Sequence, residues 1–302
     1  MATENHVKQA PSNGEPLEKD FSNTYYLGDN MDQGEAMKRI HTAGSISISP
    51  ELFEKIYLSP KNAVKGDLRK TFGNPTPIAL VGFLLCLSPL CCDLMGWRGA
   101  GGNGAAGIAS YMFFGGITMF LGGLLEFFLG NTFPSVVFCS FGAFWLTFGG
   151  TLQPSFYAYA LYAPEGQPAS AGMATVGFLS SFAFFLLFMG VLCLVFLICS
   201  LRTNVVFVVI FFTLVIAFGL LAGAYWQNAN SIMYEDPSAA ALAGRLQVTA
   251  GAILFITALS GWWIFFAIML AALDFPFQIP VGDLSTVIKG YSERMKAVEH
   301  MA

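Results

Sequence analysis

The stretch Asn74-Pro75-Thr76-Pro77-Ile78-Ala79-Leu80 opens the first of six long apolar runs in this chain. The runs cover Ile78–Met95, Ala105–Leu129, Pro134–Leu152, Thr175–Leu201, Asn204–Trp226 and Leu246–Leu273. Each reaches the roughly 17–25 residues that a helix needs to cross a hydrocarbon core of about 30 Å. The runs are continuous, whereas the strands of a membrane barrel alternate with a period of two. The sequence therefore predicts an all-α polytopic membrane protein with six transmembrane helices.

The composition fits a chain that is solvated by lipid. Of its 302 residues, 55% are hydrophobic and 11% are charged, whereas about 25% of a soluble protein is charged. No glycine-rich nucleotide motif is present, and the six cysteines all lie within the apolar runs, where a thiol behaves as a small hydrophobe. The histidines His6, His41 and His300 lie outside the runs, so no metal site is encoded. We expect no enzymatic activity, no cofactor and no nucleic-acid partner.

The placement of basic residues predicts the orientation and division of the chain. Lys and Arg gather at the ends of alternate runs, at Lys61, Lys65, Arg69, Lys70, Arg202, Lys289, Arg294 and Lys296. By the positive-inside rule, and with an even number of spans, both termini are cytoplasmic. We expect a disordered tail over 1–45, an amphipathic pre-membrane segment over 46–73, a transmembrane domain over 74–273 and a cytoplasmic tail over 274–302.

Two polar features at the membrane boundary are candidates for function. Asn74 can cap the first helix, which Pro75 or Pro77 begins, because proline lacks the amide hydrogen that would otherwise have no partner there. Such a helix start has a positive end that can receive a carboxylate, or it is only the start of a membrane helix. Glu126 is the ionisable residue at membrane depth. It either contacts substrate or protons, or it caps or salt-bridges a neighbour such as Arg202.

Glycines recur at fixed spacing in three of the runs. The pairs are Gly115 and Gly122, Gly116 and Gly123, Gly142 and Gly149, and Gly219 and Gly223. Small residues at such spacing let helices approach closely in a membrane. The spacing is compatible with contacts inside one protomer and with contacts between protomers.

Several of these motifs together resemble the acetate uptake transporter family (AceTr). That family includes bacterial succinate–acetate permeases, fungal acetate transporters and ammonium-export-type proteins. The stretch from Asn74 to Leu80 is similar to the family signature N-P-[AT]-P-[LI]-[GA]-L. Further similar segments are Gly115–Ile117, Gly122–Glu126, Gly130–Phe133, Phe144–Leu146, Trp262–Trp263 and Ile279–Asp283. The segment before the membrane, from Tyr57 to Arg69, resembles the filamentous-fungal branch.

The resemblance implies a six-helix protomer, assembled as a hexamer, with a substrate path through each protomer. It also implies a hydrophobic constriction of the path, which corresponds here to Phe83, Phe141 and Leu214. From the chemistry of such a path, we expect backbone amides with Asn131, Thr132 or Asn74 to supply hydrogen bonds to the substrate. This sequence departs from the family pattern at three positions, with Ala79 for a glycine, Met119 for a common glutamine and Phe141 for a common tyrosine.

The chemistry of the predicted path favours a small monocarboxylate. Its carboxyl group titrates near about 4.3, so it becomes increasingly neutral in an acid medium. A path without Lys or Arg cannot hold the anion strongly, which favours passage of the acid, or of the anion with a proton. We expect a plasma-membrane transporter or channel for acetate and similar small monocarboxylates, with protons as the coupled solute. The alternatives are an ammonium or ammonia exporter and a non-transporting membrane sensor.

Overall fold

The computed structural model describes residues 25–27, 46–48, 72–284 and 287–288. Two short strands, β1 (Tyr25–Leu27) and β2 (Ile46–Ile48), pair in parallel. The rest of the predicted tail over 1–45 and the part of the predicted amphipathic segment over 49–71 lie outside the described residues. Both therefore stay predictions.

Six helical segments in the described part of the chain are long and apolar enough to cross a membrane. The second span is composite, because it joins the turns η2 (Gly102–Gly107) and α5 (Ile108–Ser110) to η3 (Tyr111–Thr118) and α6 (Met119–Phe128). The other five are α4 (Thr76–Met95), α7 (Thr132–Leu152), α8 (Val176–Ser200), α9 (Val205–Met233) and α10 (Pro237–Ala272). Short 3-10 turns in the links are η1 (Trp97–Gly99), η4 (Pro154–Phe156), η5 (Ala160–Tyr162) and η6 (Ala169–Ala174). The all-α prediction with six candidate spans is confirmed.

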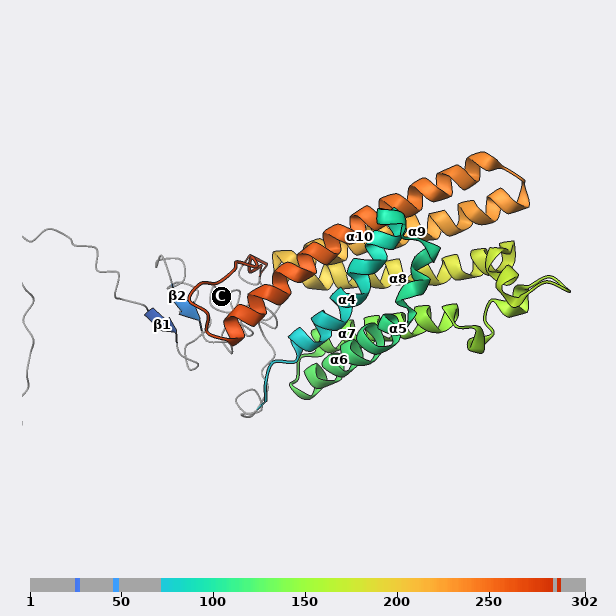
Figure 1. Ribbon diagram of the computed structural model, residues 1–302. Helices are drawn as coiled ribbons and strands as arrows, with labels where there is room; N and C mark the ends of the chain where they lie inside the picture. Colours follow the sequence, from blue (N-terminus) through green and yellow to red (C-terminus); the bar gives the residue numbers. More distant parts are fainter. Residues whose placement is uncertain (1–24, 28–45, 49–71, 285–286, 289–302) are drawn as a thin grey trace, which may run out of the picture.

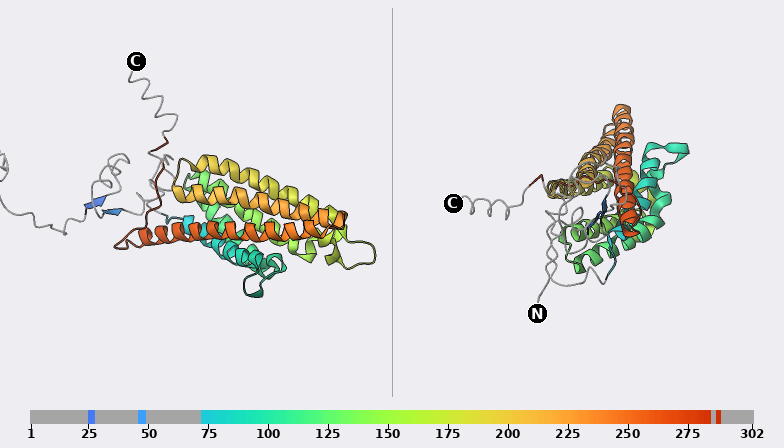
Figure 2. Two further views of the ribbon diagram at one scale, coloured as in Figure 1. Left: turned by 90° about the horizontal axis from the view of Figure 1, so that it is seen from above. Right: turned by 90° about the vertical axis from the view of Figure 1, so that its left-hand side faces the viewer.

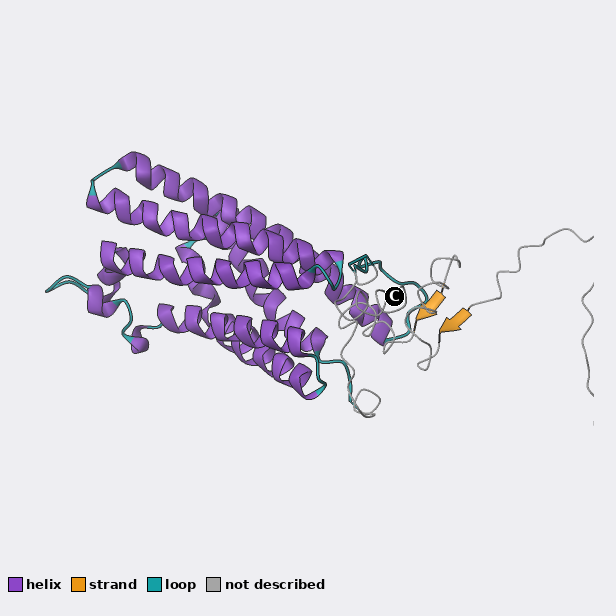
Figure 3. Cartoon of the chain, turned by 180° about the vertical axis from the view of Figure 1, so that it is seen from behind, coloured by secondary structure: helices purple, strands orange, loops and turns teal. Residues whose placement is uncertain are grey.

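The helices form one elongated bundle (Figures 1 and 2). α9 packs against both α8 and α10, α10 packs along α4, and α6 packs between α4 and α7. The start of α4 and the end of α10 lie at the same end of the bundle, which we call the tail end. The link between α9 and α10 lies at the opposite end, which we call the hairpin end. The helices follow the long axis of the bundle (Figure 3), and α9 and α10 reach the hairpin end.

The fifth and sixth helices extend further than predicted. α9 continues to Met233 rather than Trp226, and α10 begins at Pro237 rather than Leu246. The 36 residues of α10 correspond to about 54 Å, well above the roughly 30 Å of a hydrocarbon core. The extra turns of both helices are too polar to be found by hydropathy. For α10 a local signal exists, because Asp236 occupies the cap position and its Oδ1 accepts a hydrogen bond from the Ser238 amide at 2.8 Å.

Adjacent glycines hold the second span against two different helices. A Cβ atom on Gly122 would lie 2.7 Å from the amide nitrogen of Ala79 on α4, and one on Gly123 would lie 2.7 Å from that of Cys139 on α7. These contacts lie inside the protomer. Around Gly219, by contrast, nothing in the described chain lies within 4 Å of such an atom.

The middle of the second span is a π-helix, the eight residues of η3. Tyr111 at its start is buried, donates its hydroxyl to the Gly104 carbonyl at 2.9 Å and stacks on Trp145 at 5.1 Å between ring centroids. π-Helical turns are rare and wider than α-helical ones. Hydropathy depends on side chains and carries no information on backbone hydrogen bonding. The sequence therefore predicted a span here but not its π-helical segment.

The chain beyond α10 folds back onto the tail end of the bundle (Figure 1). Asp283 forms an antiparallel bridge with Asn204, and the Val205 amide donates to the Gly282 carbonyl at 2.8 Å. Val281 is buried in the main core. The first part of the predicted cytoplasmic tail is therefore part of the folded domain.

Candidate transport path

The three predicted constriction residues, Phe83, Phe141 and Leu214, come together in the middle of the bundle. They line one small cavity, the central cavity, which is completed by Leu80, Met119, Val137, Phe138, Phe207, Ile210 and Phe211. The volume open to the centre of a water molecule is about 20 Å³, which is room for about one water. Among the described residues, no charged side chain lines this cavity.

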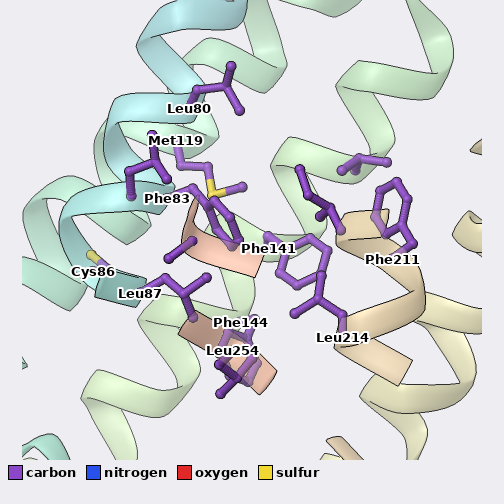
Figure 4. Close-up of a cluster of buried hydrophobic side chains, with 14 of the residues drawn as sticks. Leu80, Phe83, Cys86, Leu87, Met119, Phe141, Phe144, Phe211, Leu214 and Leu254 are labelled. Atoms are coloured by element: carbon purple, nitrogen blue, oxygen red, sulfur yellow. The ribbon is translucent and has the colours of Figure 1, made fainter. Parts of the chain in front are cut away.

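Packing of aromatic rings fixes the geometry of the constriction. The rings of Phe83 and Phe141 meet edge to face, with centroids 6.1 Å apart and an interplanar angle of 69°. Figure 4 shows these two side chains next to each other, with Leu214 entering from α9 beyond Phe141. All three are at most 5% exposed. Their role as a gate stays a prediction, but their shared position satisfies the geometry that a gate requires.

A second apolar layer closes the bundle on the hairpin-end side of the central cavity. It consists of Leu87, Phe144, Phe218 and Leu254, and we call it the apolar seal. The rings of Phe144 and Phe218 meet edge to face at 5.5 Å, and Phe144 also stacks on Phe185 at 5.9 Å. Leu87, Phe144 and Leu254 are grouped in Figure 4. The sequence prediction included the Phe144 motif but did not place it in the path.

A second cavity, the hairpin-end cavity, lies beyond the apolar seal. It is lined by Leu90, Leu94, Asn103, Phe148, Phe182, Leu186, Leu221, Ala224, Tyr225, Asn228 and Gln247, and has about 50 Å³ open to the centre of a water molecule. On each of α4, α7 and α9 a lining residue stands seven positions after the constriction residue, as Phe148 does after Phe141. Seven helical residues rise about 10.5 Å. Two turns of apolar packing therefore separate the two cavities.

A buried polar cluster lies on the tail-end side of the central cavity. The Glu126 side chain is fully buried. Thr76 donates its hydroxyl to Glu126 Oε1, and Asn131 donates its side-chain amide to Glu126 Oε2 at 2.6 Å. Thr76 and Phe83 lie on one face of α4, two turns apart. The cluster is thus on the same side of that helix as the constriction.

The start of α4 follows the predicted capping pattern. Asn74 Oδ1 accepts a hydrogen bond from the Thr76 amide at 2.9 Å, and α4 begins at Thr76, with Pro75 immediately before it and Pro77 in its first turn. Pro75 occupies the cap position itself, and Asn74, one residue earlier, supplies the side-chain acceptor for the first amide of the helix. Thr132, the first residue of α7, is exposed and lies outside the buried cluster.

The suggested salt bridge between Glu126 and Arg202 is not formed. Within the described residues, the Arg202 side chain donates through Nε to the Ile288 carbonyl at 3.2 Å, and its Nη2 is buried without a partner. Glu126 accepts hydrogen bonds from Thr76 and Asn131, and its contact with substrate or protons stays a prediction. The same part of the chain contains no group of three His, Cys, Asp or Glu side chains that could hold a metal ion.

Residues 58–286 match the model of a protein family described as GPR1/FUN34/yaaH. The chain belongs to the GPR1/FUN34/yaaH family. This confirms the resemblance to acetate uptake transporters that the sequence motifs indicated. Several relatives of the chain are named as transport proteins.

Relatives of the chain within this family carry several names. Protein alcS of Aspergillus fumigatus is 47% identical over 80% of this chain and 86% of its own length. Acetate transporter protein patA of Aspergillus clavatus is 32% identical over 70% of this chain and 79% of its own. Ammonia transport outward protein 2 of Saccharomyces cerevisiae is 29% identical over 68% and 75%. The bacterial acetate channel SatP shares the fold, with a TM-score of 0.52 and 24% identity over 70% of this chain and 99% of that structure.

Four polar residues of the candidate path were not predicted from the sequence of this GPR1/FUN34/yaaH protein. They are Asn103, Tyr225, Asn228 and Gln247, and all line the hairpin-end cavity. Within the described residues their side chains make no hydrogen bond, so their donors and acceptors are available to a solute. They lie on three separate elements, η2, α9 and α10, and no local motif joins them. The available signal was that polar side chains, three amides and one phenol, stand near the ends of apolar runs.

Proposed function

We propose that this protein moves acetate or a similar small monocarboxylate across the plasma membrane, together with a proton. The observation that carries the proposal is the central cavity, where Phe83, Phe141 and Leu214 leave room for about one water and no charged side chain is present. Such a site offers no counter-ion to a carboxylate. It fits a solute that crosses as the neutral acid.

The hairpin-end cavity supports the same mechanism. Its four polar side chains are amides and a phenol, which hydrogen-bond to a neutral carboxylic acid without an ion pair. In this cavity a carboxylic acid would replace its hydrogen bonds to water with hydrogen bonds to these side chains before it enters the apolar seal. The names of patA and SatP, which refer to acetate, agree with this class of solute.

Uptake into liposomes that contain the purified protein tests the proposal. Labelled acetate should accumulate faster when the outside is acidic than when the pH is equal on both sides, because a lower external pH increases the concentration of neutral acetic acid outside. Protein-free liposomes under the same gradient control for simple diffusion of the acid through lipid. Equal accumulation with and without protein would refute the proposed function.

Export of ammonia is the second candidate, because Ammonia transport outward protein 2 is a relative. Neutral ammonia is also compatible with an uncharged constriction. Both processes would acidify the interior, because ammonia efflux leaves a proton behind and acid uptake brings a proton in, so the solute itself has to be followed. Measuring labelled acetate and ammonia in the same liposomes separates them, and a protein that moves neither would be a sensor or a structural protein.

We also propose that both termini are cytoplasmic and that the protein forms a hexamer. Both follow from the positive-inside pattern and the family resemblance. Tags at Met1 and Ala302 should resist added protease in intact cells, and cleavage of either tag would contradict the orientation. Mass photometry in a mild detergent should find six copies, and a uniform monomer would contradict the assembly.

A further inference from the structure

Two helix starts converge on the buried Glu126 side chain. Thr76 is the first residue of α4, and Asn131 occupies the cap position of α7. Each donates a side-chain hydrogen bond to a different oxygen of the Glu126 carboxylate. An ionised carboxylate only accepts hydrogen bonds, so both donors match it. The positive ends of two helix dipoles add to this match.

The side chain of Asn131 shows how this arrangement differs from ordinary capping. A cap residue usually accepts a hydrogen bond from its own helix, but the Asn131 side chain makes no such bond in α7. Its amide is turned to Glu126, and its backbone amide donates to the Glu126 carbonyl at 2.9 Å. The chain thus uses a cap position of α7 to hold α6.

Glycine contacts one turn away bring the three helices close enough for these bonds. Gly122 precedes Glu126 by one turn and touches Ala79 of α4, while Gly123 touches Cys139 of α7. The carboxylate therefore joins helices that already meet backbone to backbone. Phe83 lies on α4 and Phe141 on α7. The hydrogen bonds to Glu126 therefore connect the two helices that carry two of the three constriction residues.

We propose that Glu126 is a positioning residue, which clamps the starts of α4 and α7 and so sets the spacing of Phe83 and Phe141 at the constriction. The effect of this clamp on transport rests on the proposed function. The clamp also gives the α4 helix start a different role from the one expected from its sequence. The chain's own carboxylate lies at this helix start, where one of the two alternatives placed a substrate carboxylate.

Two substitutions at Thr76 form a matched pair that tests the clamp. Thr76→Val has nearly the same shape but lacks the hydroxyl, whereas Thr76→Ser keeps it. The ratio of acetate to succinate uptake per folded protein should change by about threefold to tenfold in Thr76→Val and stay near the wild-type value in Thr76→Ser. Glu126→Gln, which removes one accepting oxygen, should change the ratio in the same direction as Thr76→Val.

A double variant tests whether the effect passes through the constriction. Adding Thr76→Val to Phe83→Ala should change the uptake ratio little further, because the ring that the clamp positions is already absent. Full additivity of the two effects would overturn the inference. An unchanged ratio in both Thr76→Val and Glu126→Gln, with Phe83→Ala altered, would overturn it as well.

A structural readout keeps this inference separate from the proposed function. Fluorophenylalanine at position 83 reports the surroundings of that ring by fluorine NMR, whatever solute the protein moves. Its resonance should shift in Thr76→Val and not in Thr76→Ser. If the wild type moves neither carboxylate but the resonance shifts as expected, the proposed function fails and the clamp stands. If uptake is normal and the resonance is the same in all variants, the clamp fails.

Discussion

Truncating Phe141 to alanine should open the constriction of the candidate path. Its ring meets those of Phe83, Phe144 and Phe196 at 6.1, 6.4 and 6.4 Å between centroids. Loss of a buried Phe side chain costs about 3–5 kcal/mol, and three ring contacts place this one near the upper end. A large-to-small truncation in an apolar core can leave a void on the order of 150 Å³, which is enough for a small organic molecule. The central cavity has about 20 Å³ at present.

The expected result of Phe141→Ala is therefore a less stable protein with a wider solute range. Uptake of succinate relative to acetate should rise when both are measured per folded protein in liposomes. Phe196→Ala is the matched control. Phe196 is equally buried and also meets three aromatic rings, at 5.6 to 6.4 Å, but does not line the central cavity. Equal losses of melting temperature with unchanged selectivity in both variants would mean that Phe141 is a packing residue.

Three further predictions concern stability. Gly122→Val should destabilise the protein by about 1–3 kcal/mol, because the new side chain would meet the Ala79 backbone at 2.7 Å; Gly219→Ala, with nothing within 4 Å, should be neutral or stabilising in thermal melts. Trp145→Phe should change stability by less than about 1 kcal/mol, because it removes a buried indole N–H that has no partner in the described chain; a loss as large as that of Trp145→Ala would show that this N–H is satisfied. Hydrogen bonds at the start of α10 hold the pKa of Asp236 below its usual range, so its contribution to the helix start should be complete at neutral pH and be lost as the pH falls below about 3.9. Hydrogen exchange in the first turn of α10 should thus differ between wild type and Asp236→Ala at pH 7 and agree at low pH, and a difference that persists in acid would refute the assignment.

Local sequence signals predicted those parts of the molecule that depend on local chemistry. Apolar runs gave the six spans, and Asn74 with its neighbouring prolines gave the start of α4. Contacts between distant residues were beyond such signals, since the hydrogen bond from Thr76 to Glu126 spans 50 positions. The early start of α10 was missed although Asp236 and Pro237 form a cap and a first helical proline, because only hydropathy was used to bound the spans. The constriction residues came from alignment to family motifs, and packing then determines that they face one cavity.

The long hairpin of α9 and α10 offers a point of attachment for imaging. Its link is short, and Tyr234 at its tip is 71% exposed. Both helices continue without interruption from this tip into the bundle. A small folded domain inserted at the link with continuous helical joints would therefore turn as one body with the fifth and sixth spans. Such a fusion would give electron microscopy particles a feature outside the detergent micelle, by which the orientation of each copy can be assigned.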